Sequence, residues 1–194
     1  MPMDDSQILQ ALEDTEAVRT GHFVLTSGRH SASYVQCARV LEDPALTTEL
    51  ARSAVVRLPE GLDVDIVAAP AVGGLIIGFA VAQALGVKFI FSEREQGKMV
   101  LRRSFFVPEG ARVLVVEDVV TTGGSVAEVI ELIRAAGGEV VGVVSLIDRG
   151  GRKKFDSPFW PLLTLEVESW EPDACGLCAS GVPVHSPGSR RLTE

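Results

Sequence analysis

The sequence predicts an α/β fold, with a central parallel sheet flanked by helices. Apolar runs of strand length alternate along the middle of the chain with stretches whose apolar residues recur at helical spacing. This order is typical of parallel sheets with helices on both faces. The run 113–116, Val-Leu-Val-Val, has no polar alternation, which indicates a central strand buried on both faces. At 194 residues the chain is long enough for one domain with a small appendage.

The N-terminal region precedes the alternating part. We expect a helix over residues 4–18, ended by Gly21. Residues 22–36 alternate imperfectly around a Ser-Gly turn, which indicates two short strands. Asp43-Pro44 combines an acidic cap with proline at the first helical position, so a second helix should begin there.

The alternating part supplies the sheet and its covering helices. Residues 92–106 contain a Gln-Gly centre and are expected to form a hairpin or mobile loop outside the sheet. Beyond residue 150 the chain becomes proline-rich and irregular. Strands are expected at 64–69, 87–91, 113–116, 140–147 and 162–167, and helices at 74–85 and from about 125.

Composition disfavours several classes of protein. The net charge of -8 argues against a general nucleic-acid binder, because such binding depends on clustered Lys and Arg. The apolar stretch 66–87 has the length of a membrane span, but Pro70 and two glycines divide it into a strand, a turn and a helix. The sparse cysteines, Cys37, Cys175 and Cys178, and an N-terminus unlike a signal peptide favour the reducing cytoplasm.

The residues after the central strand carry the chemistry. Glu117 and Asp118 come where that strand ends, and ligands bind at the carboxyl ends of strands in open α/β sheets. Two ionised carboxylates accept hydrogen bonds from vicinal hydroxyls, such as those of a sugar. Residues 121–125, Thr-Thr-Gly-Gly-Ser, offer backbone amides at a helix N-terminus, which suits a phosphate. A ribose 5-phosphate satisfies both halves; the alternative is that the acids merely cap the helix.

These residues resemble those of a known family. The segment VLVVEDVVTTGGS is similar to the phosphoribosyl-pyrophosphate motif of type I phosphoribosyltransferases. The segments FVLTSGRHSASYV, APAVGG and LIDRGG and the tail CGLCASGVPVHSPGSR resemble those of orotate phosphoribosyltransferases. The resemblance covers most of the chain. It implies a single domain, residues 1–194, with a core of about 41–150 and a hood from about 1–40 and part of 150–194.

The resemblance assigns roles to individual residues. Arg149 would meet the orotate carboxylate, and Thr121 would also border orotate. The segment 69–74, which includes Ala71 and Gly73, would approach the pyrophosphate through its backbone. The ribose hydroxyls would bind the acid pair, and the ribose phosphate site as a whole would comprise Glu117, Asp118, Val119, Val120, Thr121, Thr122, Gly123, Gly124 and Ser125.

A basic loop completes the implied site. Arg94 and Lys98 match the arginine and lysine of the family's mobile catalytic loop, and Arg102 and Arg103 follow them. Together with the acid pair, Arg94 and Lys98 are the expected catalytic residues, because departing pyrophosphate needs positive charge. Mg²⁺, held mainly through the substrate with no direct protein site, would share that task. The resemblance also implies a homodimer in which this loop reaches the neighbour's site.

Two positions depart from the family pattern. Thr26 stands where the family often has lysine, and the basic loop lacks the family's histidine. The pyrophosphate contacts would therefore fall to the loop cations.

The histidines and the C-terminal cysteines are a separate question. Cys175, Cys178 and His185 could supply three zinc ligands, but a closed structural site needs four, so two buried cysteines in a tight turn are the favoured interpretation. His22, His30 and His185 show no partner pattern of a general base.

The expected reaction joins orotate and 5-phosphoribosyl 1-pyrophosphate, giving orotidine 5-phosphate and pyrophosphate. Orotate is already anionic, so the reaction requires alignment and charge stabilisation more than a strong base. One alternative is a phosphoribosyltransferase for another nucleobase, because the sugar-phosphate motif is shared. The other is a non-catalytic regulator that senses phosphoribosyl pyrophosphate.

Overall fold

The fold comes from a computed structural model, in which residues 2–25, 27–150 and 153–187 are described. Its main sheet contains β3 (Ile66–Pro70), β4 (Lys88–Glu95), β5 (Lys98–Leu101), β6 (Arg112–Val120), β7 (Glu139–Asp148) and β8 (Phe159–Thr164). These strands lie in the order β5-β4-β3-β6-β7-β8, parallel except for the antiparallel edge strand β5. A smaller antiparallel sheet pairs β1 (Val18–Val24) with β2 (His30–Val35).

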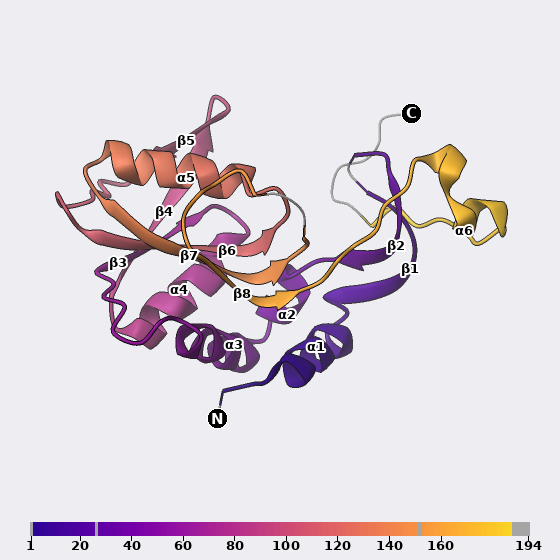
Figure 1. Cartoon of the computed structure of the whole chain (residues 1–194), viewed down its shortest axis with the longest axis horizontal. Helices are drawn as coiled ribbons and strands as arrows, with labels where there is room; N and C mark the ends of the chain where they lie inside the picture. The colour runs from indigo at the N-terminus through magenta and orange to yellow at the C-terminus, as the bar shows by residue number, and fades with distance from the viewer. Residues whose placement is uncertain (1, 26, 151–152, 188–194) are drawn as a thin grey trace.

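Helices cover both faces of the main sheet, as the sequence predicts. They are α1 (Asp5–Asp14), α2 (Ala38–Leu41), α3 (Pro44–Val56), α4 (Gly74–Leu85) and α5 (Gly124–Ala135), whereas the 3-10 helix η1 (Pro172–Ala174) and α6 (Gly176–Ala179) belong to the C-terminal segment, away from the sheet (Figure 1). Figure 1 shows α3 and α4 beneath the sheet and α5 above it. The α/β fold class is thereby confirmed.

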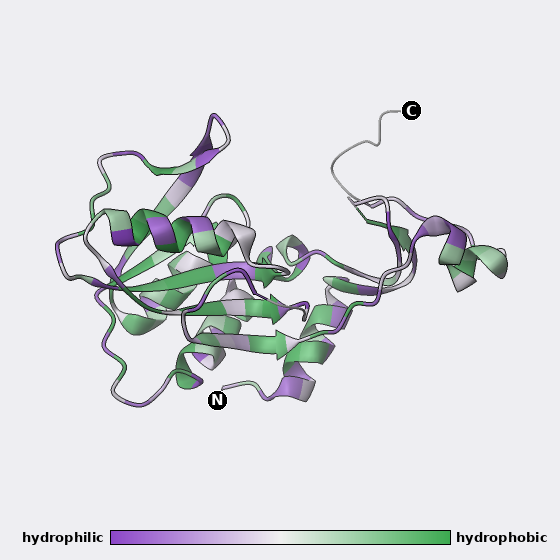
Figure 2. Cartoon of the chain, turned by 45° about the horizontal axis from the view of Figure 1, so that its top comes forward, coloured by the Kyte–Doolittle hydropathy of each residue, from purple (hydrophilic) through white to green (hydrophobic). Residues whose placement is uncertain are grey.

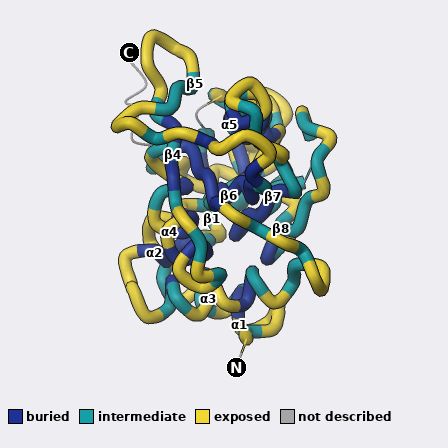
Figure 3. The backbone as a smooth tube through the Cα atoms, turned by 90° about the vertical axis from the view of Figure 1, so that its left-hand side faces the viewer, coloured by how far each residue is buried: buried dark blue, intermediate teal, exposed yellow. Residues whose placement is uncertain are grey.

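Alternating side chains of the central strands separate two apolar cores. Val67, Leu114 and Val144 lie in the core that α1, α3 and α4 complete. Val113 and Val143 point the other way, into the core completed by α5. The strands are green in Figure 2 and dark blue at the centre of Figure 3, because they are both apolar and buried. Each such side chain contributes roughly 1.5–3 kcal/mol by leaving water.

Local signals begin and end the helices around these cores. Asp43 accepts hydrogen bonds from the backbone N–H groups of Ala45 and Leu46, at 2.9 and 3.1 Å, so α3 starts where the Asp-Pro signal predicts. Gly86 ends α4 in the left-handed region, with φ of 72°. The bounds of α4 agree with the predicted helix over 74–85.

The N-terminal helix is shorter than predicted. It ends at Asp14, where the Thr15 hydroxyl donates to the backbone oxygen of Ala11 at 2.7 Å. Val18 already pairs with Val35 across the small sheet, so strand pairing overrides helix continuation, and Gly21 lies within β1. The expectation of a helix over 4–18 ended by Gly21 was wrong, whereas the two short strands on either side of the Ser-Gly turn are confirmed.

Three strand predictions need correction. The central strand runs past 116 to Val120, since Val119 and Val120 still pair with β7. The hairpin in 92–106 belongs to the sheet, because β4 continues to Glu95 and β5 pairs with it; only its tip projects (Figure 1). The last strand covers 159–164 instead of 162–167, because it starts where Phe159 pairs with Val143 of β7.

The apolar stretch 66–87 folds as β3 and α4, as predicted. Within the described residues, none of the helices has the length and apolarity that a bilayer crossing requires.

The hood contains the β1–β2 hairpin and the C-terminal segment 168–187, which lie side by side in Figure 1 although they are far apart in sequence. Phe23 forms a parallel bridge with His185, and His30 forms an antiparallel bridge with Trp170. Arg29 donates to the Ser169 hydroxyl at 2.9 Å and forms an ion pair with Glu171. Thr26 lies outside the described residues.

Candidate active site

Glu117 and Asp118 lie near the carboxyl end of β6, beside the turn that leads into α5. The Glu117 residue is 8% exposed, and its carboxylate accepts the Asp118 N–H at 3.2 Å. The Asp118 carboxylate accepts the Val119 N–H at 2.8 Å. In the described part of the chain neither acid forms an ion pair with a basic residue. The pair therefore offers carboxylate oxygens to a ligand.

Burial of two neighbouring acids changes how they titrate. Burial and the adjacent Asp118 charge raise the pKa of Glu117 well above its usual range. Burial also raises the pKa of Asp118. In the free protein the pair therefore favours a shared proton near neutral pH, and hydroxyl donors or a cation would compensate the full negative charge.

The turn between β3 and α4 lies directly against these acids. A Cβ atom at Gly73 would come within 2.7 Å of an Asp118 carboxylate oxygen, and one at Gly74 within 2.9 Å of the Val116 backbone oxygen. Only glycine permits this approach of backbone to carboxylate. The structure thus brings the predicted pyrophosphate segment, with Ala71 and Gly73, to the acid pair.

The turn after the acid pair, called the anion site below, has the geometry that the predicted phosphate contact requires. Gly123 has φ of 73°, and α5 begins at Gly124, so backbone amides at the positive end of the helix face the turn. A cavity of about 50 Å³ lies here, whereas one water needs only about 10–15 Å³. Its lining includes most of the predicted set, without Asp118 and Thr122 and with Val126 in addition: Glu117, Val119, Val120, Thr121, Gly123, Gly124, Ser125 and Val126. A phosphate-sized group would fit.

Lys153 is a neighbour of this turn that sequence reasoning missed. Its ammonium donates to the backbone oxygens of Thr121 at 3.1 Å and Gly150 at 2.8 Å, and it forms an ion pair with Asp148. It thereby fastens the end of β7 to the anion site. The only sequence signal for Lys153 is that it belongs to a basic cluster after the Asp-Arg-Gly-Gly turn. Such a cluster by itself indicates a solvent-exposed surface.

Arg149 is the half-buried cation of the site. Its backbone N–H donates to the Val120 oxygen at 2.9 Å, which places it beside the start of the anion site. Burial lowers the pKa of the Arg149 guanidinium. Its Nε is buried and finds no hydrogen-bond acceptor among the described residues. A planar anionic group would satisfy this donor.

The predicted loop cations lie on the β4–β5 hairpin and in the segment after it, and the arginines are paired with acids. Arg94 binds Glu128 of α5 through two hydrogen bonds, at 2.9 and 3.0 Å. Arg103 contacts Glu93 at 2.9 Å, and Arg102 lies 3.7 Å from Glu95. Lys98 is exposed at the start of β5 and lines a hollow of about 570 Å³ against α5.

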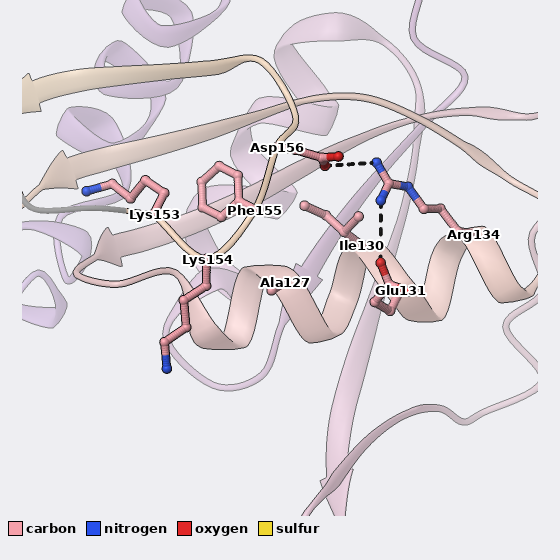
Figure 4. A pocket seen from close by; sticks show the side chains of 8 residues that line it. All are labelled: Ala127, Ile130, Glu131, Arg134, Lys153, Lys154, Phe155 and Asp156. Atoms are coloured by element: carbon pink, nitrogen blue, oxygen red, sulfur yellow. Dashed lines mark hydrogen bonds and ion pairs between the residues drawn. The ribbon is translucent and has the colours of Figure 1, made fainter.

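A second hollow, of about 770 Å³, opens between α5 and the segment 153–156, and Figure 4 shows its lining. There Arg134 donates to Glu131 at 3.4 Å and to Asp156 at 3.2 Å, as the dashed lines mark. The arginine of this hollow is thus already neutralised by two acids, and Glu117 and Asp118 do not line the hollow. We therefore assign the active site to the smaller cavity at the end of β6.

The C-terminal cysteines have different partners from those expected. Ligand atoms of Cys175, Cys178, His22 and His30 all lie within 4.8 Å of one another. His185, considered as a possible third zinc ligand, is not in this group, because it bridges to Phe23 instead. The favoured interpretation of two buried cysteines is also wrong for Cys178, which is exposed. Local sequence reasoning missed His22 and His30 because the fold brings them from the other end of the chain.

Comparison with known proteins places this geometry in a class. A family model for the phosphoribosyl transferase domain matches residues 38–174, which include the acid pair, the anion site and the basic hairpin. A solved orotate phosphoribosyltransferase from Aeropyrum pernix superposes with a TM-score of 0.69 at 28% identity, over 82% of this chain and 94% of that one. The fold is that of a type I phosphoribosyltransferase.

Closer relatives narrow the class. The orotate phosphoribosyltransferase of Heliobacterium modesticaldum is 50% identical over 97% of this chain and 100% of its own length. That of Desulforamulus reducens is 49% identical over 98% of this chain and 100% of its own. The chain belongs to the orotate phosphoribosyltransferase family.

The buried acid pair predicts an unusual pH dependence of stability. Because the folded-state pKa of Glu117 is raised, ionisation disfavours the folded protein, and stability falls as pH rises from the ordinary carboxyl range through the raised pKa. At pH 8 the thermal midpoint of Glu117→Gln should therefore lie several degrees above that of the ligand-free wild type. The conversion is roughly 2–4 °C per kcal/mol of unfolding free energy. Near pH 5 the two proteins should have the same midpoint.

Calorimetry without divalent cations measures this difference. Glu131→Gln, on the exposed side of α5, is the control and should follow the wild type at every pH. A difference between Glu117→Gln and wild type that stayed constant with pH would contradict the titration of the pair.

Proposed function

We propose that this chain catalyses phosphoribosyl transfer from 5-phosphoribosyl 1-pyrophosphate to orotate, with the site at the end of β6 holding both substrates. The observation that carries the choice of base is Arg149, a half-buried guanidinium whose Nε finds no acceptor in the described chain. Orotate is a planar carboxylate, and arginine recognises such groups through paired N–H donors. The reaction is the nucleotide-forming step of pyrimidine synthesis.

The sugar and phosphate subsites follow from the local geometry. Glu117 and Asp118 accept hydrogen bonds from the ribose hydroxyls, since their oxygens have no cationic partner among the described residues. Residues 121–125 hold the 5-phosphate through backbone amides and hydroxyls at the start of α5. Thr121 follows the Val120 carbonyl that binds the Arg149 backbone, so orotate and ribose would meet there.

The chemical step is a displacement at C1 of the ribose. The bond from C1 to the pyrophosphate oxygen breaks, and its electron pair leaves with pyrophosphate. The orotate ring nitrogen forms the new bond to C1, and its proton passes to the departing pyrophosphate or to water. Ribose carries positive charge in between, and the nearby carboxylates stabilise that charge. Alignment of the two substrates supplies much of the remaining acceleration.

The loop cations are proposed to receive the leaving pyrophosphate. Arg94, Arg102 and Arg103 would exchange their glutamate partners for it, and Lys98 would join them. The exchange is inexpensive, because exposed ion pairs contribute only about 0.2–1 kcal/mol each. Closure of the hairpin would also exclude water from the reactive sugar.

Mg²⁺ is the proposed cofactor. The uncompensated carboxylates of Glu117 and Asp118 are hard oxygen donors, the kind that Mg²⁺ prefers alongside substrate phosphates. Bound mainly through the substrate, the ion would supply positive charge to the departing pyrophosphate. Turnover should accordingly cease when a chelator removes divalent cations and return when Mg²⁺ is added.

A homodimer is also proposed. Val72, Ile76 and Phe79, on α4 and the turn before it, are 80, 52 and 59% exposed, a concentration of apolar side chains that a second copy would cover. Sedimentation of the full chain should return the mass of two copies, and a monomer at micromolar concentration would contradict this assembly.

We also propose that the activity is in the cytoplasm, because none of the three cysteines forms a disulfide. Cell fractionation checks this location.

The decisive assay follows loss of orotate absorbance with phosphoribosyl pyrophosphate and Mg²⁺. Lys98→Ala and Asp118→Asn should each lower turnover by about 10²–10³-fold, because they remove charge that acts in the transition state. Arg149→Gln should raise the KM for orotate by about 10–100-fold, the loss of a charge-assisted contact, with little change in that for phosphoribosyl pyrophosphate. Arg134→Gln, a basic residue paired outside the site, is the control.

The outcomes separate the alternatives. If the wild type binds phosphoribosyl pyrophosphate but consumes another nucleobase instead of orotate, the chain is a phosphoribosyltransferase for that base. Binding with no turnover of any base would identify a regulator.

The ion pair of Arg94 with Glu128 allows a test of the loop exchange. Glu128→Ala should strengthen product inhibition by pyrophosphate by up to about fivefold, since it frees Arg94 from a pair of at most about 1 kcal/mol. Glu131→Ala, one turn along α5 and paired with Arg134, should leave the inhibition constant unchanged. Weaker inhibition in Glu128→Ala would show that Arg94 does not reach pyrophosphate.

A further inference from the structure

Four ligand atoms from opposite ends of the chain meet inside the hood. His22 Nε2 lies 2.9 Å from His30 Nδ1, 3.4 Å from Cys175 Sγ and 3.7 Å from Cys178 Sγ. Cys178 Sγ lies 3.2 Å from His30 Nδ1, and all four atoms are within 4.8 Å of one another. Two sulfurs and two imidazole nitrogens thus surround a single point.

These separations are within about 0.4 Å of those around a zinc ion. In tetrahedral sites Zn–S is about 2.3 Å and Zn–N about 2.0–2.1 Å, which separates neighbouring ligand atoms by roughly 3.3–3.8 Å. The four separations given above lie between 2.9 and 3.7 Å. An S₂N₂ set at this spacing is typical of zinc and unsuited to Mg²⁺ or Ca²⁺, which take oxygen ligands.

A backbone contact already orients one ligand. The Nδ1 of His22 lies 2.8 Å from the Val182 backbone oxygen, so Nδ1 carries the proton and Nε2 presents its lone pair to the cluster. Metal-binding histidines usually have their second nitrogen held in this way. The His22 ring is also 1% exposed, which leaves it little freedom to turn away.

Hydrogen bonding alone does not satisfy this arrangement. A neutral His22 Nε2 has one lone pair, yet three possible donors surround it: the His30 nitrogen and both thiols. If the His30 nitrogen donates to it, neither thiol can use this acceptor. If each thiol donates to one histidine instead, the two bare imidazole nitrogens face each other at 2.9 Å. One central cation would bind all four atoms at once.

The location gives such an ion a structural task. We call residues 168–187 and the turn joining β1 to β2 the hood tip. Among its described residues, none contributes a buried side chain to either apolar core. His22 and His30 belong to β1 and β2, whereas Cys175 directly precedes the four-residue helix α6 and Cys178 lies within it. A metal would join these two segments where apolar burial is scarce.

We propose that His22, His30, Cys175 and Cys178 bind one structural Zn²⁺ that closes the hood. The site lies apart from the acid pair and the anion site, so it stands or falls independently of the proposed reaction. Because all four positions are filled by protein, the ion takes no part in catalysis.

Metal analysis of the untagged full-length protein, expressed with zinc in the medium, tests the proposal. The wild type should contain one zinc per chain after dialysis. Cys178→Ser should lose it, and because Cys178 is exposed, this variant should still fold. His185→Gln is the matched control: its ring lies outside the cluster while its backbone pairs with β1, so it should keep the ion.

Cobalt substitution supplies a readout independent of folding. Wild type and His185→Gln should show the intense visible bands of tetrahedral Co²⁺ with a thiolate charge-transfer band, and Cys178→Ser should lose that band. Strong chelation should lower the thermal midpoint of the wild type and leave Cys178→Ser unchanged. A wild type that neither retains zinc nor takes up cobalt, or a Cys178→Ser variant that keeps both, would overturn the site.

Discussion

The site depends on holding two acids side by side at the end of β6. Burial and mutual repulsion disfavour their ionised forms, so the sheet must pin them while the fold itself gains nothing from their charge. Backbone amides of Asp118 and Val119 bind them, and the turn at Gly73 leaves room for the Asp118 carboxylate. The hydroxyl donors and cations that compensate the two acids then come from the ligand. In a stable core, by contrast, the protein itself supplies the partners of its buried polar groups.

The cations of the site are arranged in two ways. The arginines on the β4–β5 hairpin and just after it are paired with glutamates on the surface, where the partners exchange at small cost. Arg149 is half-buried and has an unsatisfied nitrogen within the described chain, so its guanidinium awaits a specific anion. An acidic chain can therefore recognise two anionic substrates, because the local arrangement of charge matters more than the net charge of -8.

The sequence predicted the parts of the site that are local. The acid pair, the Thr-Thr-Gly-Gly-Ser turn and the helix over 74–85 each lie within one short stretch whose pattern follows from periodicity and turn chemistry. It could not predict the sulfur and nitrogen cluster, because His22 and Cys175 are separated by 153 positions. The same limit explains the β4–β5 hairpin, whose place in the sheet depends on pairing that propensity does not encode.

The meeting of both chain ends in the hood has a consequence for how the protein folds during synthesis. The β1–β2 hairpin emerges early, yet its hydrogen bonds with Trp170 and His185 require residues made last. The core helices and strands can pack while the hairpin waits, exposed, for the end of the chain to arrive. Premature termination just after β8, at residues 165–168, would thus leave an intact sheet beneath an unfinished cover, vulnerable to proteases at its N-terminal edge.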